Sequence, residues 1–186
     1  MIFLDREQAL LELSGRVSNK NLIIHSFAVE SIMKALGSIL DEDVELWSLT
    51  GLLHDIDFEK TLLAPEKRGK VGAEILENLG LDETIVYAVK AHNDIHGIDR
   101  RRKLDKALYA TDPISELIFV YLESIPSKSI NDINVKGVME KFYDNTFAQQ
   151  IDRSKILECE KIGLSLDRFV EISIDAIKDI SDKIKL

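Results

Sequence analysis

Apolar residues recur along this chain at intervals of three and four, which is the period of an amphipathic α-helix. Between positions 19 and 40, for example, the apolar stripe advances by 3, 4, 3 and 4 residues, and His25 stands on it. No stretch shows a convincing alternation of apolar and polar residues, the pattern of a half-buried strand. Only 3 prolines interrupt the 186 residues, so long helices are possible. The pattern predicts an all-α fold.

Capping residues and helix breakers place the individual helices. Asn19, the acidic run 41–43 and Asp82 are typical N-caps, and Gly80 is a typical helix end. Pro113 disfavours helical geometry at the preceding residue, so we expect a kink or a break at Asp112. The apolar segment 114–122 is expected to be buried. The expected helices are 5–17, 19–40, 44–54, 71–79, 83–92, 100–112, 135–143, 151–162 and 166–185.

The chain has the length of one domain that buries most of its apolar surface around a single core. It contains no internal repeat and no low-complexity segment. We therefore expect one all-α domain over residues 1–186, with a motif-bearing core of about 20–122 and C-terminal helices of about 134–185.

Composition and charge narrow the class of protein. With 33 acidic and 24 basic residues the net charge is −9, which argues against extensive binding to nucleic acid or to anionic membranes but not against one small phosphorylated ligand. The single cysteine, Cys159, excludes an intrachain disulfide and a cysteine-based zinc site. The apolar start, Met1 to Leu4, is too short for a signal peptide, and no apolar run approaches the roughly 20 residues that span a bilayer. We expect a soluble cytoplasmic protein.

The candidate chemistry lies in polar residues that stand in apolar surroundings. His54 and Asp55 are adjacent and follow an apolar run, His25 lies 29 residues before His54, and Asp112 lies 57 residues after Asp55. Each has a structural alternative: a hydrogen-bonded core histidine, an imidazolium at a helix C-terminus, or a helix cap. Together they place imidazole and carboxylate groups near a core, where an unpaired carboxylate costs several kcal/mol. One divalent metal ion would satisfy all four residues.

The order His25, His54-Asp55, Asp112 resembles the HD superfamily of metal-dependent phosphohydrolases, and in particular its small stand-alone members. The resemblance extends to the surrounding segments NLIIHS (21–26), LLHDID (52–57), VGAEIL (71–76) and KALYATD (106–112). It implies a helical bundle of the HD type in which His25, His54, Asp55 and Asp112 bind one metal ion. Two imidazoles and two carboxylates suit Mn²⁺, Fe²⁺, Co²⁺, Ni²⁺ or Mg²⁺.

Members of this superfamily with two metals carry additional histidines. His92 stands where one of them occurs, but position 68, where the other is expected, is an arginine. We therefore do not expect a second metal. Arg68 is instead a candidate for binding a substrate phosphate through its planar guanidinium, the alternative being a solvated loop residue.

Three further residues are candidates for substrate binding. His92 itself could contact the substrate, or it could be a hydrogen-bonded histidine at a helix end. Lys60 lies just past the His-Asp pair. Arg101 belongs to the basic run 100–103, which we expect at the start of a helix, where positive charge opposes the helix dipole. That run could attract an anion to the site, or it could pair with acidic residues on the surface.

These residues predict a phosphohydrolase that acts on a nucleotide or another small phosphorylated substrate through water activated by the metal. Asp55 or Asp57 would orient that water. One alternative is a non-catalytic HD domain that senses a nucleotide or a metal. Another is a helical interaction module in which His25 and Asp112 only satisfy one another. The sequence leaves open whether the bond broken is a monoester, a diester or a pyrophosphate, and it does not indicate an oligomeric state.

Overall fold

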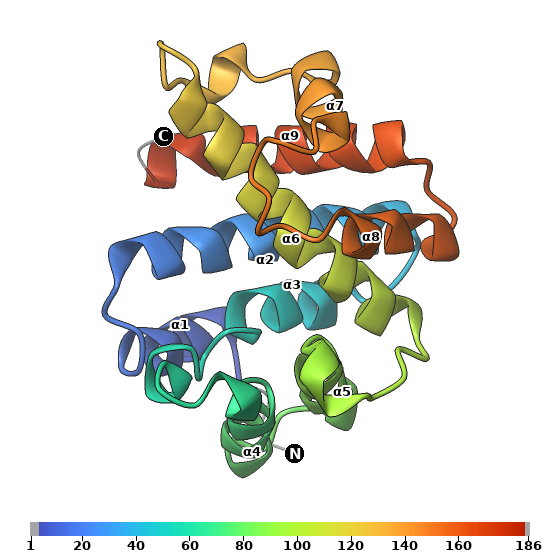
Figure 1. The fold of residues 1–186 in the computed structure, drawn as a ribbon. Coiled ribbons are helices and arrows are strands. Elements are labelled where there is room, and N and C mark those ends of the chain that lie inside the picture. Colours follow the sequence, from blue (N-terminus) through green and yellow to red (C-terminus); the bar gives the residue numbers. More distant parts are fainter. Residues whose placement is uncertain (1–3, 185–186) are drawn as a thin grey trace.

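The computed structural model describes residues 4–184, which form nine α-helices joined by turns and short 3₁₀ helices and contain no strand (Figure 1). The predicted all-α fold is confirmed. The helices are α1 (Arg6–Ser14), α2 (Lys20–Ile39), α3 (Val44–Leu53), α4 (Lys70–Asn78), α5 (Glu83–Ala91), α6 (Lys103–Ser124), α7 (Val135–Tyr143), α8 (Arg153–Ile156) and α9 (Leu166–Ile184).

Local capping explains where several helices begin. The side chains of Asn19, Asp43 and Asp82 accept hydrogen bonds from backbone N–H groups in the first turns of α2, α3 and α5, as predicted. Asp5 and Gln8 form a capping box at the start of α1. These contacts satisfy N–H groups that have no partner within their own helix.

Helix α2 runs through the middle of the molecule, with α3 on one side, α9 on the other and α6 crossing it (Figure 1). It approaches α3 closely at Gly51, where a Cβ atom would lie 2.8 Å from Glu30 Cα and from the Val29 carbonyl oxygen. Only glycine allows this contact. One turn after Gly51, at the end of α3, His54 lies beside His25, in the second turn of α2.

Helix α2 also corrects one expectation. An 18-residue stretch of this helix has a mean hydropathy of 1.4, so by length and composition alone α2 could cross a membrane, although no apolar run of that length was expected. Half of that apolar stretch is buried inside the fold. Ala28, Ile32 and Leu36 are fully buried in the hydrophobic core, which gives the apolar residues of α2 a structural role in the folded chain.

Of the kink or break expected at Asp112, the break is wrong. Helix α6 continues through Pro113 to Ser124. The proline removes one backbone donor, but residues on both sides of it, including Leu108, Ile114 and Leu117, are fully buried. Tertiary packing of the apolar faces therefore outweighs the local preference of the proline.

The start of α6 and the region before α9 also differ from expectation. Asp105 accepts hydrogen bonds from the N–H groups of Arg101 and Arg102, so the helix begins at Lys103 and most of the basic run precedes it. The helix expected over 151–162 is the short α8 followed by a 3₁₀ helix, Leu157–Ile162. The last predicted helical residue, Lys185, lies outside the described residues, as do Met1 to Phe3.

Candidate metal centre

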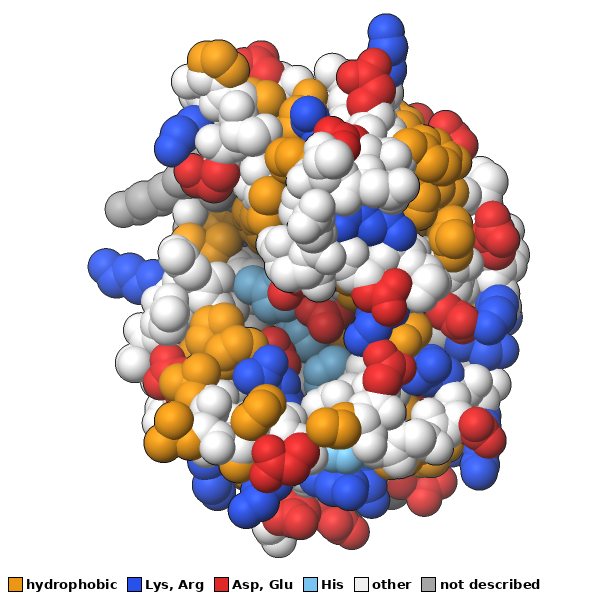
Figure 2. Space-filling view, in the orientation of Figure 1, with side chains coloured by type: hydrophobic (Ala, Val, Ile, Leu, Met, Phe, Trp, Pro, Cys, Tyr) orange, Lys and Arg blue, Asp and Glu red, His pale blue; other side chains and the backbone are white. Residues whose placement is uncertain are grey.

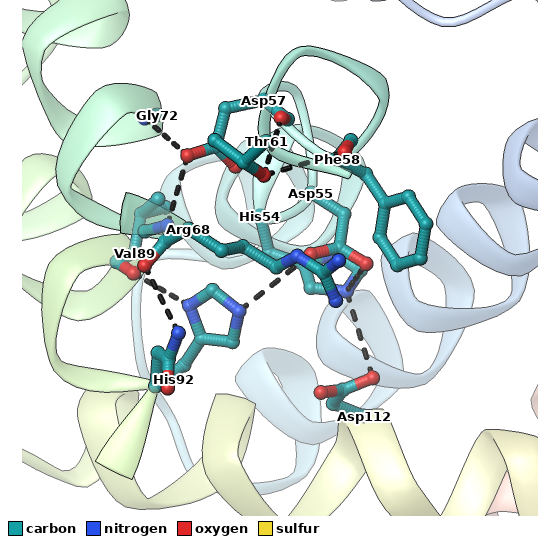
Figure 3. A network of polar contacts seen from close by, with 12 residues as sticks. His54, Asp55, Asp57, Phe58, Thr61, Arg68, Gly72, Val89, His92 and Asp112 are labelled. Atoms are coloured by element: carbon teal, nitrogen blue, oxygen red, sulfur yellow. Dashed lines mark hydrogen bonds and ion pairs between the residues drawn. The ribbon is translucent and has the colours of Figure 1, made fainter. Parts of the chain in front are cut away.

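Four side chains from three helices and one turn converge on a single point. His25 comes from the second turn of α2, His54 caps the C-terminus of α3, Asp55 follows it, and Asp112 lies in α6. His25 Nε2 lies 3.2 Å from His54 Nε2 and 3.1 Å from Asp112 Oδ1. His54 Nε2 lies 3.7 Å from both Asp112 Oδ1 and Asp55 Oδ2. Figure 3 shows several of these groups turned toward one another.

The other nitrogen of each imidazole is held by a second group. His54 Nδ1 donates to the Gly51 carbonyl at 2.8 Å. His25 Nδ1 lies 3.1 Å from Ser115 Oγ, and the Ser115 hydroxyl donates to the Asp112 carbonyl, so its oxygen is left to accept the Nδ1 proton of His25. Both Nε2 lone pairs then face the same point, which is how histidine ligands of a metal are oriented.

The two carboxylates of the cluster favour a positive charge between the four side chains. Burial acts to lower the pKa of His54, but the carboxylates of Asp55 and Asp112 outweigh it and raise that pKa to about 9. Burial likewise acts to raise the pKa of Asp112, yet the two imidazoles hold it well below its usual range. Two lone pairs 3.2 Å apart beside two carboxylates are stable only with a proton or a metal ion between them.

The spacing of these atoms fits one metal ion. Two ligand atoms each about 2.1 Å from an ion lie about 3.0 Å apart when their bonds are perpendicular and about 3.4 Å apart at the tetrahedral angle. The separations of 3.1 and 3.2 Å lie within this range, and the two of 3.7 Å lie slightly above it. Candidate ligand atoms of His25, His54 and Asp55 all lie within 4.8 Å of one another, and all three residues are buried. Three of the four residues predicted from sequence, His25, His54 and Asp55, thus form a group that could hold a divalent ion, and Asp112 Oδ1 lies beside the two imidazoles.

His92, at the end of α5, also faces the cluster. Its Nδ1 donates to the Val89 carbonyl at 2.5 Å, and its Nε2 lies 3.7 Å from Asp55 Oδ1. The rings of His54 and His92 meet edge to face, with centroids 5.6 Å apart. The structure therefore brings this predicted residue next to Asp55, with its Nδ1 bonded to a backbone carbonyl, as in His54.

Asp57, predicted beside Asp55 as a residue that orients water, has a different environment. Its Oδ2 accepts from the N–H groups of Gly69 at 2.8 Å and Gly72 at 2.7 Å, which caps the start of α4 (Figure 3). A Cβ atom at Gly72 would lie 3.2 Å from this carboxyl group. Burial raises the pKa of Asp57, although both N–H groups act to lower it. This geometry gives Asp57 a structural role, and its role in orienting water stays a prediction.

Arg68 lies on the loop that precedes α4. Its guanidinium carbon lies 3.7 Å from the centroid of the Phe58 ring, and its carbonyl oxygen accepts from Asn93 Nδ2 at 3.0 Å and from His96 Nε2 at 2.6 Å. Its Nε is buried and has no hydrogen-bond partner among residues 4–184. Figure 3 shows the side chain reaching across the site toward Asp55.

The structure does not bring Lys60 or Arg101 into the cluster. Both side chains are exposed, and within the described part of the chain neither forms an ion pair with the four candidate ligands. The Arg101 guanidinium lies 5.7 Å from the ring centroid of Tyr87. Its neighbour Arg100 packs over Tyr109 at 3.6 Å and pairs with Asp94, as the surface alternative for this basic run anticipated.

Sequence reasoning missed two residues of the site. Ser115 stands three positions after Asp112 on the same helix face, but it could be recognised only if α6 was expected to continue through Pro113. Phe58 carried no signal of its own. In the face drawn in Figure 2, imidazole and carboxylate groups are visible at the bottom of a hollow, so the cluster is accessible from outside.

Comparison with known proteins places this site in context. The model of the HD domain family matches residues 22–122. An uncharacterized protein of Methanocaldococcus jannaschii is 36% identical over 141 residues, which cover 71% of this chain and 81% of that protein. Ribonuclease Y of Mesoplasma florum is 30% identical over 99 residues, 48% of this chain but 19% of the enzyme. Ribonuclease Y of Aliarcobacter butzleri is 24% identical over 190 residues, 95% of this chain and 35% of the enzyme. The chain thus spans about a fifth to a third of these ribonucleases. No solved structure gives a significant match.

Proposed function

This chain belongs to the HD domain family, and from that premise we propose that it is a metal-dependent phosphohydrolase acting on a nucleotide or another small phosphorylated substrate. One observation carries the proposal. The Nε2 atoms of His25 and His54 lie 3.2 Å apart, with Asp112 Oδ1 3.1 Å from the first, and the Nδ1 atoms of both imidazoles are engaged elsewhere. That arrangement favours a divalent cation over any neutral occupant.

His25, His54, Asp55 and Asp112 would hold the metal, and Mn²⁺, Fe²⁺, Co²⁺, Ni²⁺ or Mg²⁺ all accept this set of donors. A divalent ion there lowers the pKa of a water molecule and polarises a phosphoryl group. Ser115 and the Gly51 carbonyl fix the two imidazoles, so little reorganisation is needed when the ion binds. One metal per chain is proposed, because a fixed positive charge at Arg68 opposes a second cation.

Arg68 and His92 are the proposed substrate contacts. The guanidinium of Arg68 is a charged donor with no protein acceptor among residues 4–184, and it matches the geometry of phosphate oxygens. His92 Nε2 points toward Asp55 and can donate a proton or a hydrogen bond once protonated. Lys60 and Arg101 are proposed only as outer contacts of a larger substrate.

Product formation is the test of the enzymatic proposal. Purified protein loaded with Mn²⁺ is assayed for release of phosphate or polyphosphate from nucleoside mono-, di- and triphosphates and simple phosphomonoesters, and for the linear product of a cyclic dinucleotide. The expected result is turnover of at least one substrate that is abolished by EDTA and by Asp55→Ala. A metal-loaded protein that binds nucleotides but hydrolyses none of the panel would instead be a sensor.

A second substrate class follows from the relatives named ribonuclease Y, one of which matches 95% of this chain. We propose single-stranded RNA as that alternative substrate, with a phosphodiester as the bond that is broken. The net charge of −9 disfavours extended RNA binding, so only cleavage close to a strand end is expected. A short labelled RNA added to the same panel separates the two classes by the size of its products.

Thermal unfolding separates both enzymes from an interaction module without a ligand. If the ion binds only the folded chain, metal at 100 times its dissociation constant adds about 2.7 kcal/mol to the free energy of unfolding. EDTA reverses the gain. An unfolding midpoint that responds to neither metal nor EDTA would contradict the proposed metal site.

A further inference from the structure

The guanidinium of Arg68 packs against an aromatic ring, and its N–H groups have no acceptor in the described structure. It lies 3.7 Å from the centroid of the Phe58 ring, within the distance of a cation–π contact. Such a contact uses the flat face of the guanidinium, whereas its N–H groups point outward in the plane. Among residues 4–184 the side chain of Arg68 donates no hydrogen bond and forms no ion pair, and its Nε is nevertheless buried. A buried charged donor without an acceptor is costly unless a ligand supplies the acceptor.

The ring of Phe58 is itself tied to the metal centre. Phe58 follows Asp55 by three residues, and its backbone N–H donates to the Asp55 carbonyl at 2.9 Å. On its other side, the Thr61 N–H donates to the Phe58 carbonyl at 3.2 Å. The half-buried ring is thus presented by the same turn that presents a metal ligand (Figure 3).

The backbone of Arg68 is held from the opposite side of the site. Its carbonyl accepts from Asn93 and His96, and the N–H of the next residue, Gly69, donates to Asp57. Gly69 has a φ of +83°, a conformation that favours glycine and sets the direction in which the chain leaves Arg68. Both ends of the arginine, its backbone and its guanidinium, are therefore fixed before a ligand binds.

From this geometry we propose that Phe58 is a positioning residue, whose ring holds the Arg68 guanidinium as a planar two-pronged receptor for a phosphate group beside the metal. The proposal rests on the proposed function for the identity of the anion. Its physical basis is preorganisation, because a free arginine side chain loses rotamer freedom when it binds and a stacked one has already lost it. An aliphatic side chain at position 58 would keep the burial but not the attraction to the cation.

A double-mutant cycle with inorganic phosphate as the probe tests this role. Phosphate binding is measured by calorimetry on protein that is loaded with Mn²⁺ and freed of excess ion. Phe58→Leu and Phe58→Met are expected to weaken binding by about 3- to 30-fold, the range for loss of a cation–π contact in a partly desolvated site. Phe58→Tyr keeps a ring face and should bind within about twofold of the parent. In the Arg68→Ala background, Phe58→Leu should change binding by less than about twofold.

Phe27 offers a matched control. It is also a half-buried phenylalanine whose ring faces an arginine, with the Arg6 guanidinium 5.9 Å from its ring centroid. It differs in position, because it lies on α2 and not in the turn that carries Asp55 and Phe58. Phe27→Leu should leave phosphate binding unchanged.

Several outcomes would overturn the inference. The first is an equal loss of phosphate affinity from Phe58→Leu in the parent and in the Arg68→Ala background. The second is a parent protein that does not bind phosphate. The third is failure of both Phe58→Leu and Phe58→Met to fold, which would make Phe58 a packing residue. The proposed function can fail separately. If no substrate is hydrolysed but phosphate binding follows the expected cycle, the positioning role of Phe58 stands and only the enzymatic proposal falls.

Discussion

Two arginines of this molecule, Arg68 and Arg153, each have an Nε that is buried without a partner in the described structure, but the remaining N–H groups of the two guanidiniums differ in their contacts. Arg153, at the start of α8, donates to carbonyl groups of α7 and of the segment that follows it, those of Lys141, Phe147, Ala148 and Ile151. Arg68, in the segment between α3 and α4, donates to no group of the described chain and lies against the Phe58 ring beside the candidate metal centre. A guanidinium whose N–H groups bond to carbonyl groups of its own chain holds the backbone in place, whereas one whose N–H groups lack acceptors is available to a ligand.

Two aspartates show the same contrast within one turn. Asp55 has His54 and His92 as its ionic neighbours, each 3.7 Å away, and both lie in the cluster. Asp57, two residues later, uses one oxygen to accept two backbone N–H groups at the start of α4. Asp55 thus belongs to the candidate site, whereas Asp57 stabilises the start of α4. Substitutions of the two residues can separate these roles.

The largest expected effect comes from Asp55→Ala. It removes a proposed ligand, so metal content should fall from near one per chain to near zero, and turnover should fall by at least about a thousandfold because several kcal/mol of charge stabilisation are lost. Elemental analysis and the phosphate-release assay measure these changes.

Asp57→Asn is the matched control. It should keep the metal but lower the free energy of unfolding by about 1–3 kcal/mol, because the charged acceptor at the start of α4 is lost. Equal metal content in Asp55→Ala and the parent would refute the assignment of Asp55 as a ligand.

Arg153→Ala should produce the next largest change, and in stability rather than in binding. Removing the guanidinium leaves several carbonyl groups without their donor, so we expect the free energy of unfolding to fall by about 2–4 kcal/mol in urea titrations, with metal content and phosphate binding unchanged. Arg168→Ala, at an exposed ion pair with Glu171 on α9, should change it by less than about 0.5 kcal/mol. If Arg153→Ala weakens phosphate binding without lowering stability, the contrast between the two arginines is lost.

Arg68→Ala should show the opposite profile. Loss of one charge-assisted phosphate contact costs about 1.5–3 kcal/mol, or roughly ten- to more than a hundredfold in kcat/KM, while stability changes little. Metal content should stay near one per chain. Arg68→His sharpens the comparison, since it adds an imidazole to a site that already contains His92 and should allow a second metal to bind. Parent-like turnover and metal content in both variants would make Arg68 an ordinary loop residue.

The smallest expected effect is a change with pH in the free energy of unfolding of the metal-free protein. The pKa of His54 is raised to about 9 in the folded chain, above its ordinary value of 6.5. Its contribution to stability is therefore fully present below pH 6.5 and is lost as the pH rises through 9. The urea midpoint of EDTA-treated protein should fall over this interval.

The metal-loaded protein should not share this decline, because the ion replaces the proton. Metal uptake near pH 7.5 should release about one proton, which calorimetry in buffers of different ionisation enthalpy detects. Metal uptake without proton release would contradict a protonated His54 in the metal-free site.

Much of the fold was predictable because its signals are local. The three-and-four spacing of apolar residues located most of the helices, and Asn19, Asp43 and Asp82 marked where three of them begin. His25, His54, Asp55 and Asp112 were recognisable because each is a metal-binding type of residue in an apolar neighbourhood, and because their order resembles one family. The match of the HD domain family to residues 22–122 confirms that resemblance.

Contacts between distant segments decided the rest. Local preference predicted a kink or a break at Asp112, but burial of α6 on both sides of Pro113 keeps the helix continuous and so places Ser115 against His25. The cap that Asp57 provides and the stack of Arg68 on Phe58 join positions ten to fifteen residues apart through an irregular loop. A loop has no period that reveals which way its side chains point. The sequence by itself thus identified the candidate metal ligands, because residue type and order are local information, and the tertiary structure decided which of their neighbours orient them and which charge stays open for a ligand.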